Sequence, residues 1–267
     1  MALDKYEHYY DEVENFARKG KTLNRRRSKI RQLNSNLESA FVISVARGRY
    51  ILNNGLMGRT SREVGAKKIV VGDKIKYIKS FNANVDNTLV QITQLEPRES
   101  VLQRQTGKNA VNVKTVAANF ASVIILESLD NKRYSKDFIQ QIINSLETQK
   151  FDGESIKIII GLTKCDLEDK YLVGEKIKKD FFNFPILEFS KDENLPFFPD
   201  FVTVFIGHSG VGKSSLLNRY VPNAFQKMAE VNQTTNQGRH TTSAVRAFPY
   251  KKTWLIDTPG VRSFQAI

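Results

Sequence analysis

The pattern of apolar positions divides the 267-residue chain into three stretches. Residues 1–36 are polar and charged without a sustained period, which predicts a helix at most and otherwise disorder. From residue 40 onward, short runs rich in Val, Ile and Tyr alternate with turn residues such as Asn53, Asn54 and Gly55. Several short strands in one stretch are typical of a small barrel such as the OB-fold. We expect the strands at residues 41–46, 49–52, 68–71, 74–78 and 89–95.

The pattern changes again after residue 98, where a polar linker leads into a nearly continuous apolar run at 119–126. Such a run is expected of a strand that is buried on both faces. Five apolar side chains then recur at helical spacing: Phe138, Ile139, Ile142, Ile143 and Leu146. Alternating strands and helices indicate a mostly parallel sheet with ligands at the carboxyl ends of its strands. The remaining strands are expected at residues 156–162, 184–189, 201–206, 245–248 and 253–256.

Charge adds a candidate partner to this picture. The chain has 41 Lys and Arg against 28 Asp and Glu, a net charge of +13, which favours nucleic acid over a merely soluble basic protein. The excess is clustered, because residues 18–31 hold eight basic residues and no acidic one. We therefore expect a basic arm at 1–36, an OB-fold-like RNA-binding domain at 37–98 and an α/β domain at 99–267. The candidate RNA-binding residues are Arg25, Arg26, Arg27, Lys29, Arg31, Arg47 and Arg49.

Composition argues against several other classes of protein. No apolar run approaches the roughly 20 residues that span a bilayer, and the N-terminus lacks the apolar stretch of a secretory signal. Cys165 is the only cysteine, so an intramolecular disulfide or a thiolate zinc site cannot form. We expect a cytoplasmic monomer with no membrane partner and no zinc site in this chain.

Residues 207–214 read Gly-His-Ser-Gly-Val-Gly-Lys-Ser, a complete G-x-x-x-x-G-K-[ST] phosphate loop. Lys213 is expected to bridge the β- and γ-phosphates, and Ser214 to bind Mg²⁺. A glycine-rich structural turn is the alternative, but a predicted strand precedes this motif and Leu216 and Leu217 follow it. The expected nucleotide contacts are Gly207, His208, Ser209, Gly210, Val211, Gly212, Lys213, Ser214 and Ser215.

Thr163-Lys164-Cys165-Asp166 matches the [NT]-K-x-D motif that reads guanine. Alone this tetrapeptide is a weak signal, because it often only caps a helix, but it ends a buried strand in a chain with a phosphate loop. Asp166 would accept hydrogen bonds from the guanine N1 and N2 groups, which adenine cannot offer. Lys164 would lie along the purine ring. Thr163 replaces the more usual Asn at a cost in affinity, and Cys165 is expected to be a packing residue.

Residues 257–260 read Asp-Thr-Pro-Gly, in which Asp257 would hold Mg²⁺ and the Gly260 N–H would face the γ-phosphate. Val261 follows, and valine cannot orient the attacking water as glutamine does in many small GTPases. His240 is the candidate for that catalytic role, against the alternative of an ordinary loop histidine. Thr241 or Thr242 is the candidate switch threonine that senses the γ-phosphate through Mg²⁺.

The order of these motifs predicts the architecture. The guanine-reading motif precedes the phosphate loop and Asp-Thr-Pro-Gly follows it, whereas an ordinary GTPase begins with the phosphate loop. We predict an α/β fold in which an N-terminal OB-fold-like β-barrel is followed by a circularly permuted P-loop GTPase domain.

These motifs, with Ala-Ala-Asn at 117–119, Gly-Arg-His-Thr-Thr at 238–242 and the run 255–264, give the chain a family resemblance from about residue 38 to its end. It resembles the bacterial ribosome small-subunit-dependent GTPase A family, RsgA/YjeQ. The resemblance implies binding to the small ribosomal subunit and its rRNA, a late role in assembly, and hydrolysis of GTP to GDP that the subunit stimulates. It also implies a catalytic role for His240.

Two features depart from the family pattern. Family members continue into a C-terminal zinc domain, whereas this chain ends seven residues after Gly260 with no cysteine there, so we expect a truncated GTPase domain. The family's Ser-Ala-Lys-like guanine loop corresponds to Ser190 and Lys191, followed by a short segment with two prolines. Two other functions remain open: a nucleotide-gated RNA-binding module with little or no hydrolysis, and an ATP-using phosphate-loop enzyme.

Overall fold

The structure is a computed structural model, and its secondary structure is dominated by strands. Among the residues that it describes, it has fifteen strands and three helices. These described residues are 37–46, 48–61, 64, 68–79, 89–106, 112–130, 134–166, 171–190, 202–222 and 244–259.

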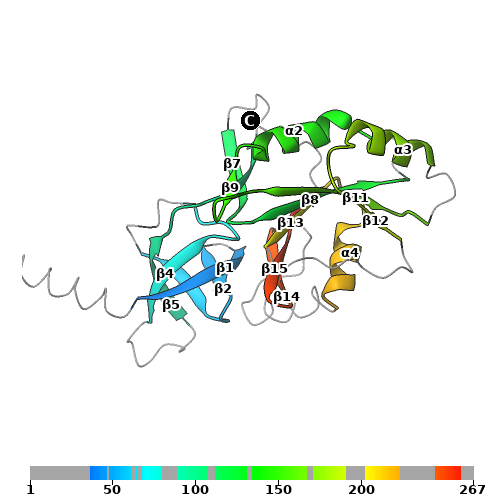
Figure 1. Cartoon of the computed structure of the whole chain (residues 1–267). Helices are drawn as coiled ribbons and strands as arrows, with labels where there is room; N and C mark the ends of the chain where they lie inside the picture. Colours follow the sequence, from blue (N-terminus) through cyan, green and yellow to red (C-terminus); the bar gives the residue numbers. More distant parts are fainter. Residues whose placement is uncertain are drawn as a thin grey trace, which may run out of the picture.

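The first five strands form a closed barrel, seen at the lower left of Figure 1. They follow the order β1-β2-β3-β5-β4, and β4 pairs back with β1 to close the barrel. β3 and β5 are parallel, and the other neighbours are antiparallel. This arrangement confirms the OB-fold-like barrel. The strands are β1 (Glu38–Ala46), β2 (Arg49–Leu52), β3 (Met57–Thr60), β4 (Lys74–Lys79) and β5 (Leu89–Leu95).

Two sequence predictions in this half were wrong. Residues 68–71 do not form a strand, although Ile69, Val70 and Val71 are buried, because only Val71 makes a β-bridge, to Ala117. β3 is the third barrel strand instead. The segment after residue 98 is not a simple polar linker, since β6 (Val101–Thr106) and β7 (Asn112–Ala118) pair there as an antiparallel hairpin.

The second half is built on a sheet with the order β12-β11-β8-β13-β15-β14. The first five of these strands are parallel, and β14 is antiparallel to β15. The phosphate-loop strand β13 therefore lies in the middle of the sheet although it comes late in the chain, which confirms the circular permutation. The strands are β8 (Ser122–Ser128), β11 (Lys157–Thr163), β12 (Ile186–Phe189), β13 (Thr203–Gly207), β14 (Arg246–Tyr250) and β15 (Thr253–Asp257), with a short hairpin of β9 (Lys150–Phe151) and β10 (Glu154–Ser155).

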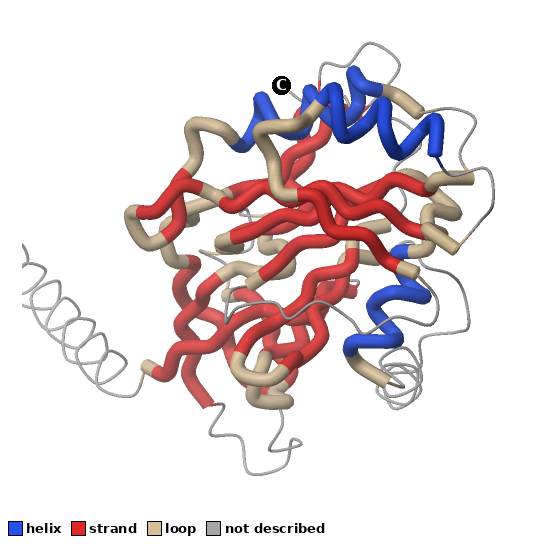
Figure 2. The backbone as a smooth tube through the Cα atoms, turned by 45° about the vertical axis from the view of Figure 1, so that its right-hand side comes forward, coloured by secondary structure: helices blue, strands red, loops and turns tan. Residues whose placement is uncertain are grey.

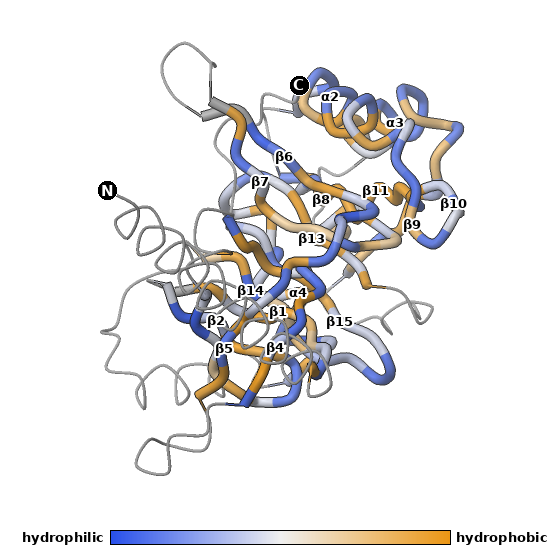
Figure 3. Tube along the Cα trace, turned by 90° about the vertical axis from the view of Figure 1, so that its left-hand side faces the viewer, coloured by the Kyte–Doolittle hydropathy of each residue, from blue (hydrophilic) through white to orange (hydrophobic). Residues whose placement is uncertain are grey.

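Helices cover both faces of this sheet. In Figures 1 and 2, α2 (Lys136–Leu146) and α3 (Tyr171–Asp180) lie on one face and α4 (Lys213–Tyr220) on the other. Alternate residues of β8 point to opposite faces: Val123 and Ile125 join the core under α2, and Ile124 joins the core under α4. Figure 3 shows the resulting hydrophobic colour along the central strands and the mixed colouring of α2. The predicted helical face at 138–146 is confirmed.

The barrel and the α/β sheet are joined by strand pairing. Ser44 of β1 pairs with Arg246 of β14, so the two sheets form one continuous eleven-stranded sheet. Arg98, just after the last barrel strand, donates hydrogen bonds to both carboxylate oxygens of the fully buried Asp73, at 2.7 and 2.8 Å. The same Asp73 carboxylate accepts a bond from the Val70 N–H. This buried ion pair therefore fastens the residues before β4 to the end of the barrel.

Candidate functional site

The carboxyl ends of the neighbouring parallel strands β13 and β15 meet at a cavity of about 270 Å³. One side of the cavity is formed by the phosphate loop and the start of α4, and the other by the end of β15 and the residues after it. These two parts are more than forty positions apart in the chain. A crevice at this edge is where open α/β sheets bind ligands. The lining residues are Ser209, Gly210, Gly212, Lys213, Ser214, Ser215, Asp257, Thr258 and Pro259.

Two glycines shape the phosphate loop. A Cβ at Gly207 would lie 2.5 Å from the Leu126 carbonyl oxygen, so the close approach of β13 to β8 requires glycine at the strand end. Gly212 is the N-cap of α4 and has φ +94°, a left-handed conformation that glycine adopts without strain. The loop thus turns sharply into α4 and presents the positive end of that helix to the cavity.

Lys213 is the buried cation of the cavity. Its Nζ donates hydrogen bonds to the carbonyls of Gly207 and His208, at 2.7 and 2.9 Å. Burial lowers the pKa of Lys213, and the charge of Asp257 opposes that shift. Burial raises the pKa of Asp257 to about 6, against the attraction of Lys213 and Arg246. Burial thus outweighs the mutual attraction of the two groups.

The Asp257 carboxylate fits the expected magnesium site. Asp257 is 8% exposed, and its Oδ1 atom is buried with no hydrogen-bond partner among the described residues. An orphaned carboxylate oxygen in a buried site is suited to a hard divalent cation. Ser214 lines the same cavity and offers a second oxygen ligand.

The guanine-reading motif contacts the phosphate loop directly. Thr163 ends β11, is 5% exposed, and its hydroxyl bonds to the Val211 carbonyl at 2.6 Å. Cys165 is buried in the core, in agreement with its predicted packing role. Lys164 has φ +58°, and its ammonium pairs with Asp130 rather than lying free. Asp166 is exposed, at the end of the sheet where the motif was expected.

Three contacts at this end of the sheet had no sequence signal. The Cys165 N–H donates to the Phe189 carbonyl at 3.4 Å and thereby joins the motif to the end of β12. Arg219 of α4 donates to the Ser190 carbonyl at 2.7 Å. The His208 ring lies 4.1 Å from the ring of Phe138, between centroids. These contacts hold Ser190 and the phosphate loop against neighbouring elements.

Several predicted site residues lie outside the described residues: Lys191, His240, Thr241, Thr242, Gly260, Arg47 and the arm residues Arg25, Arg26, Arg27, Lys29 and Arg31. Arg49 is described and lies partly exposed on β2. Within the described ranges, no group of three or more His, Cys, Asp or Glu side chains is placed to hold a metal ion. None of the described helices is long and apolar enough to cross a membrane.

The chain is similar to a known family of proteins. The family model described as RsgA GTPase matches residues 95–267. A protein of Streptococcus agalactiae named small ribosomal subunit biogenesis GTPase RsgA is 27% identical over 232 residues, covering 85% of this chain and 73% of the relative. A protein of the same name from Chlorobaculum tepidum is 25% identical, and the match covers 85% of this chain and 75% of the relative. A third, from Mycoplasmopsis pulmonis, is 28% identical, and the match covers 73% of this chain and 63% of the relative.

Proposed function

Because the chain belongs to the RsgA GTPase family, we propose that it binds the small ribosomal subunit and acts as a late-stage maturation factor of that subunit. In this role it hydrolyses GTP to GDP, and the subunit stimulates the reaction. The relatives' name, small ribosomal subunit biogenesis GTPase, supports the choice of partner.

The observation that carries the proposal is the single cavity in which Lys213, Ser214 and Asp257 meet, beside the Thr163 to Val211 contact. Catalysis of phosphoryl transfer is mainly positioning and charge stabilisation. The loop amides and Lys213 would hold the β- and γ-phosphates, and Asp166 would select guanine. Ser214 and Asp257 would hold Mg²⁺, which when bound neutralises charge on the phosphate oxygens, with Thr241 or Thr242 as a further ligand.

We assign the positioning of the attacking water to His240, because Val261 offers no polar group. His240→Ala should leave nucleotide affinity nearly unchanged and slow the subunit-stimulated rate, since the water is oriented only in the transition state. Lys213→Ala should instead remove turnover altogether. A large loss of GTP affinity in His240→Ala would make that residue structural.

The discriminating experiment is single-turnover GTP hydrolysis with and without purified small subunits. A GTPase that is switched on by the subunit shows a large increase in rate. A rate that does not change with added subunits would favour the second candidate, a nucleotide-gated RNA-binding module. That candidate is motivated by valine at position 261, where many small GTPases have glutamine. Competition by excess ATP tests the ATP-using alternative, because effective displacement of labelled GTP contradicts guanine selection by Asp166.

We further propose that RNA attachment rests on the arm at 1–36 and the barrel at 37–98 rather than on the GTPase domain at 99–267. Each phosphate neutralised by a basic side chain releases counterions, so affinity should fall by roughly 0.7 to 0.9 log units per contact for each decade of salt. Deleting residues 1–36 should flatten this dependence without changing guanine-nucleotide affinity. An unchanged dependence of affinity on salt would indicate that the RNA contacts lie on the barrel and not on the arm.

A further inference from the structure

A second cavity, of about 360 Å³, lies between the barrel, the β6–β7 hairpin and the α/β sheet. The barrel side contributes Val45, Tyr50 and residues 68–71, and the hairpin contributes Leu102, Arg104 and residues 114–116. Ile206, residues 244–245, Thr258 and Pro259 complete it from the α/β side. Its volume falls in the usual range of about 300 to 1,000 Å³ for small-molecule sites.

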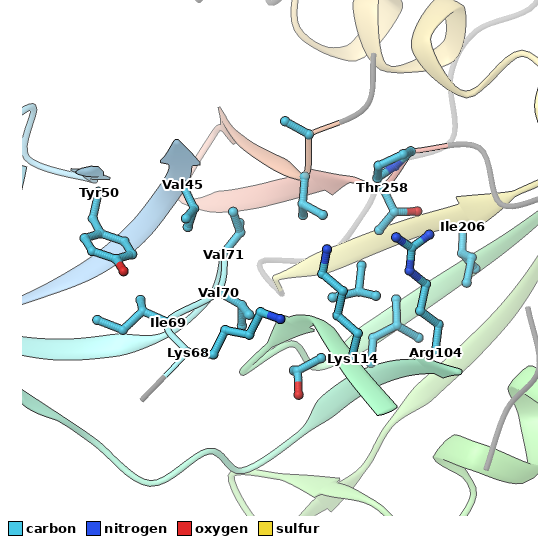
Figure 4. Close-up of a pocket in the computed structure, with 16 residues that line it drawn as sticks. Val45, Tyr50, Lys68, Ile69, Val70, Val71, Arg104, Lys114, Ile206 and Thr258 are labelled. Carbon is cyan, nitrogen blue, oxygen red and sulfur yellow. The ribbon is translucent and has the colours of Figure 1, made fainter. Parts of the chain in front are cut away.

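Most of the lining is apolar, but three basic side chains enter the same space. Figure 4 shows Lys68, Arg104 and Lys114 on one side of the cavity, with Lys114 and Arg104 extending toward Thr258. They come from the segment after β3 and from both strands of the β6–β7 hairpin. None of the described residues that line the cavity is acidic, so three positive charges face a mostly apolar chamber.

Like charges that gather without a counter-charge are destabilising unless an anion joins them. The Nε–H of Arg104 is buried and has no hydrogen-bond partner among the described residues. Although Lys114 is largely exposed, its partial desolvation lowers its pKa, and the charges of Arg104 and Lys68 lower it further. Within the described ranges, none of the three forms an ion pair with a carboxylate. A buried, unused guanidinium donor beside two lysines is thus an unsatisfied anion site.

We propose that this cavity is a second nucleotide site, in which Lys68, Arg104 and Lys114 bind a phosphate group and the apolar lining accepts the base. A simple inorganic anion would leave the apolar chamber unfilled. A lipid-like ligand would need a longer apolar channel than this cavity provides. A nucleotide offers both parts, and the Tyr50 ring at the barrel side provides an aromatic surface for the base. The nucleotide is either a free molecule or an unstacked residue of a bound RNA strand.

This site is distinct from the cavity at the phosphate loop and does not depend on the function proposed above. The two cavities share only Thr258 and Pro259. The Thr258 hydroxyl is held by a 2.7 Å hydrogen bond to the Phe205 carbonyl, so these residues separate the cavities as a fixed segment. They also follow Asp257 directly, so the second site lies beside the segment that is proposed above to hold the guanine nucleotide and Mg²⁺.

The first arm of the test uses the full chain saturated with GDP and Mg²⁺, so that the phosphate loop is occupied. Adenosine 5′-monophosphate is titrated by calorimetry, because the guanine-reading motif has no use for adenine. We expect saturable one-to-one binding that Arg104→Gln and Lys114→Gln each weaken about tenfold, the effect of one charged hydrogen bond. Lys179→Gln, which removes an exposed charge from the end of α3, is the matched control and should change the affinity less than twofold.

The second arm titrates a short single-stranded oligouridylate at fixed salt into the same variants. Loss of oligouridylate affinity in the two cavity variants, without binding of adenosine 5′-monophosphate, identifies the ligand as a nucleotide of RNA. Binding of the free nucleotide with the expected variant pattern identifies a small-molecule site. The proposal is overturned if neither probe separates the cavity variants from Lys179→Gln. Unfolding midpoints verify that each variant is folded, and the exposed position of Lys114 makes its replacement the safer of the two.

Discussion

The Thr163 hydroxyl donates a 2.6 Å hydrogen bond to the Val211 carbonyl, across 48 positions of the chain. Both residues are buried, and Thr163 Oγ1 also lies 3.3 Å from the Glu127 carbonyl. The side chain that replaces the more usual asparagine therefore fastens the guanine-reading motif to the phosphate loop. The motif expected to read the base is thus joined directly to the loop expected to hold the phosphates.

Thr163→Val should weaken GDP binding about tenfold and lower stability by about 1 to 3 kcal/mol, because the Val211 carbonyl is left buried without its donor. Thr163→Ser is the matched control, since it keeps the hydroxyl and loses only a methyl group. Fluorescence titration with labelled GDP and urea unfolding measure the two effects. Equal behaviour of the two variants would show that the hydroxyl contributes nothing.

Asp166→Asn should abolish GTP affinity and create affinity for xanthosine triphosphate. The reason is that the amide donates to the xanthine O2, which takes the place of the guanine amino group, while its oxygen still accepts from N1. The exposed Asp152→Asn, in the turn between β9 and β10, is a control for the loss of one negative charge. Competition titrations with both triphosphates give the answer, and a mutant that still prefers GTP would refute the assignment.

Asp257 should make the stability of the nucleotide-free, chelator-treated protein fall as the pH rises from about 4 to about 6. Its pKa is raised from 3.8 to about 6, so in this window the folded protein retains a proton that the unfolded chain has released. The full shift corresponds to about 3 kcal/mol, at order-of-magnitude precision.

In Asp257→Asn this component of the pH dependence should vanish, as measured by urea unfolding between pH 4 and 7. Asp152→Asn again serves as the control, because its carboxylate is exposed. Parallel stability curves for the wild type and Asp257→Asn would mean that the carboxylate does not titrate in this range. With Mg²⁺ and GDP present, the same substitution should instead weaken nucleotide binding.

The Arg98–Asp73 pair should contribute more to stability than an exposed ion pair, because the Asp73 carboxylate is fully buried. Arg98→Ala leaves the fully buried Asp73 carboxylate without its partner and should cost about 3 to 5 kcal/mol in urea unfolding. Lys74→Ala breaks the exposed pair with Glu99, whose side chains are 42% and 38% exposed, and should cost less than about 1 kcal/mol. Similar costs for the two variants would contradict the role of burial.

Much of the fold was accessible from local pattern, because buried strands and amphipathic helices carry their own periodicity. The run at 119–126 and the helical spacing at 138–146 correspond to β8 and α2. The apolar run at 68–71 led to a wrong strand prediction, because its residues are buried without pairing as a strand. The sequence did not predict β3 because Gly58 resembles a turn residue. In the structure Gly58 lies within the strand, and the glycine is needed there because a Cβ would lie 2.7 Å from Ile92 Cδ1.

The sequence by itself determined the motifs, their permuted order and hence the fold class, since each motif is a short run whose chemistry does not depend on distant residues. Only the tertiary structure decided that Thr163 reaches Val211 and that Lys68, Arg104 and Lys114 share one cavity. It also decided that Asp257 is buried with an oxygen that no described residue bonds. These relationships join residues that are distant in the chain or lie on different elements. Their energies arise from desolvation and charge proximity, which exist only after the chain has folded.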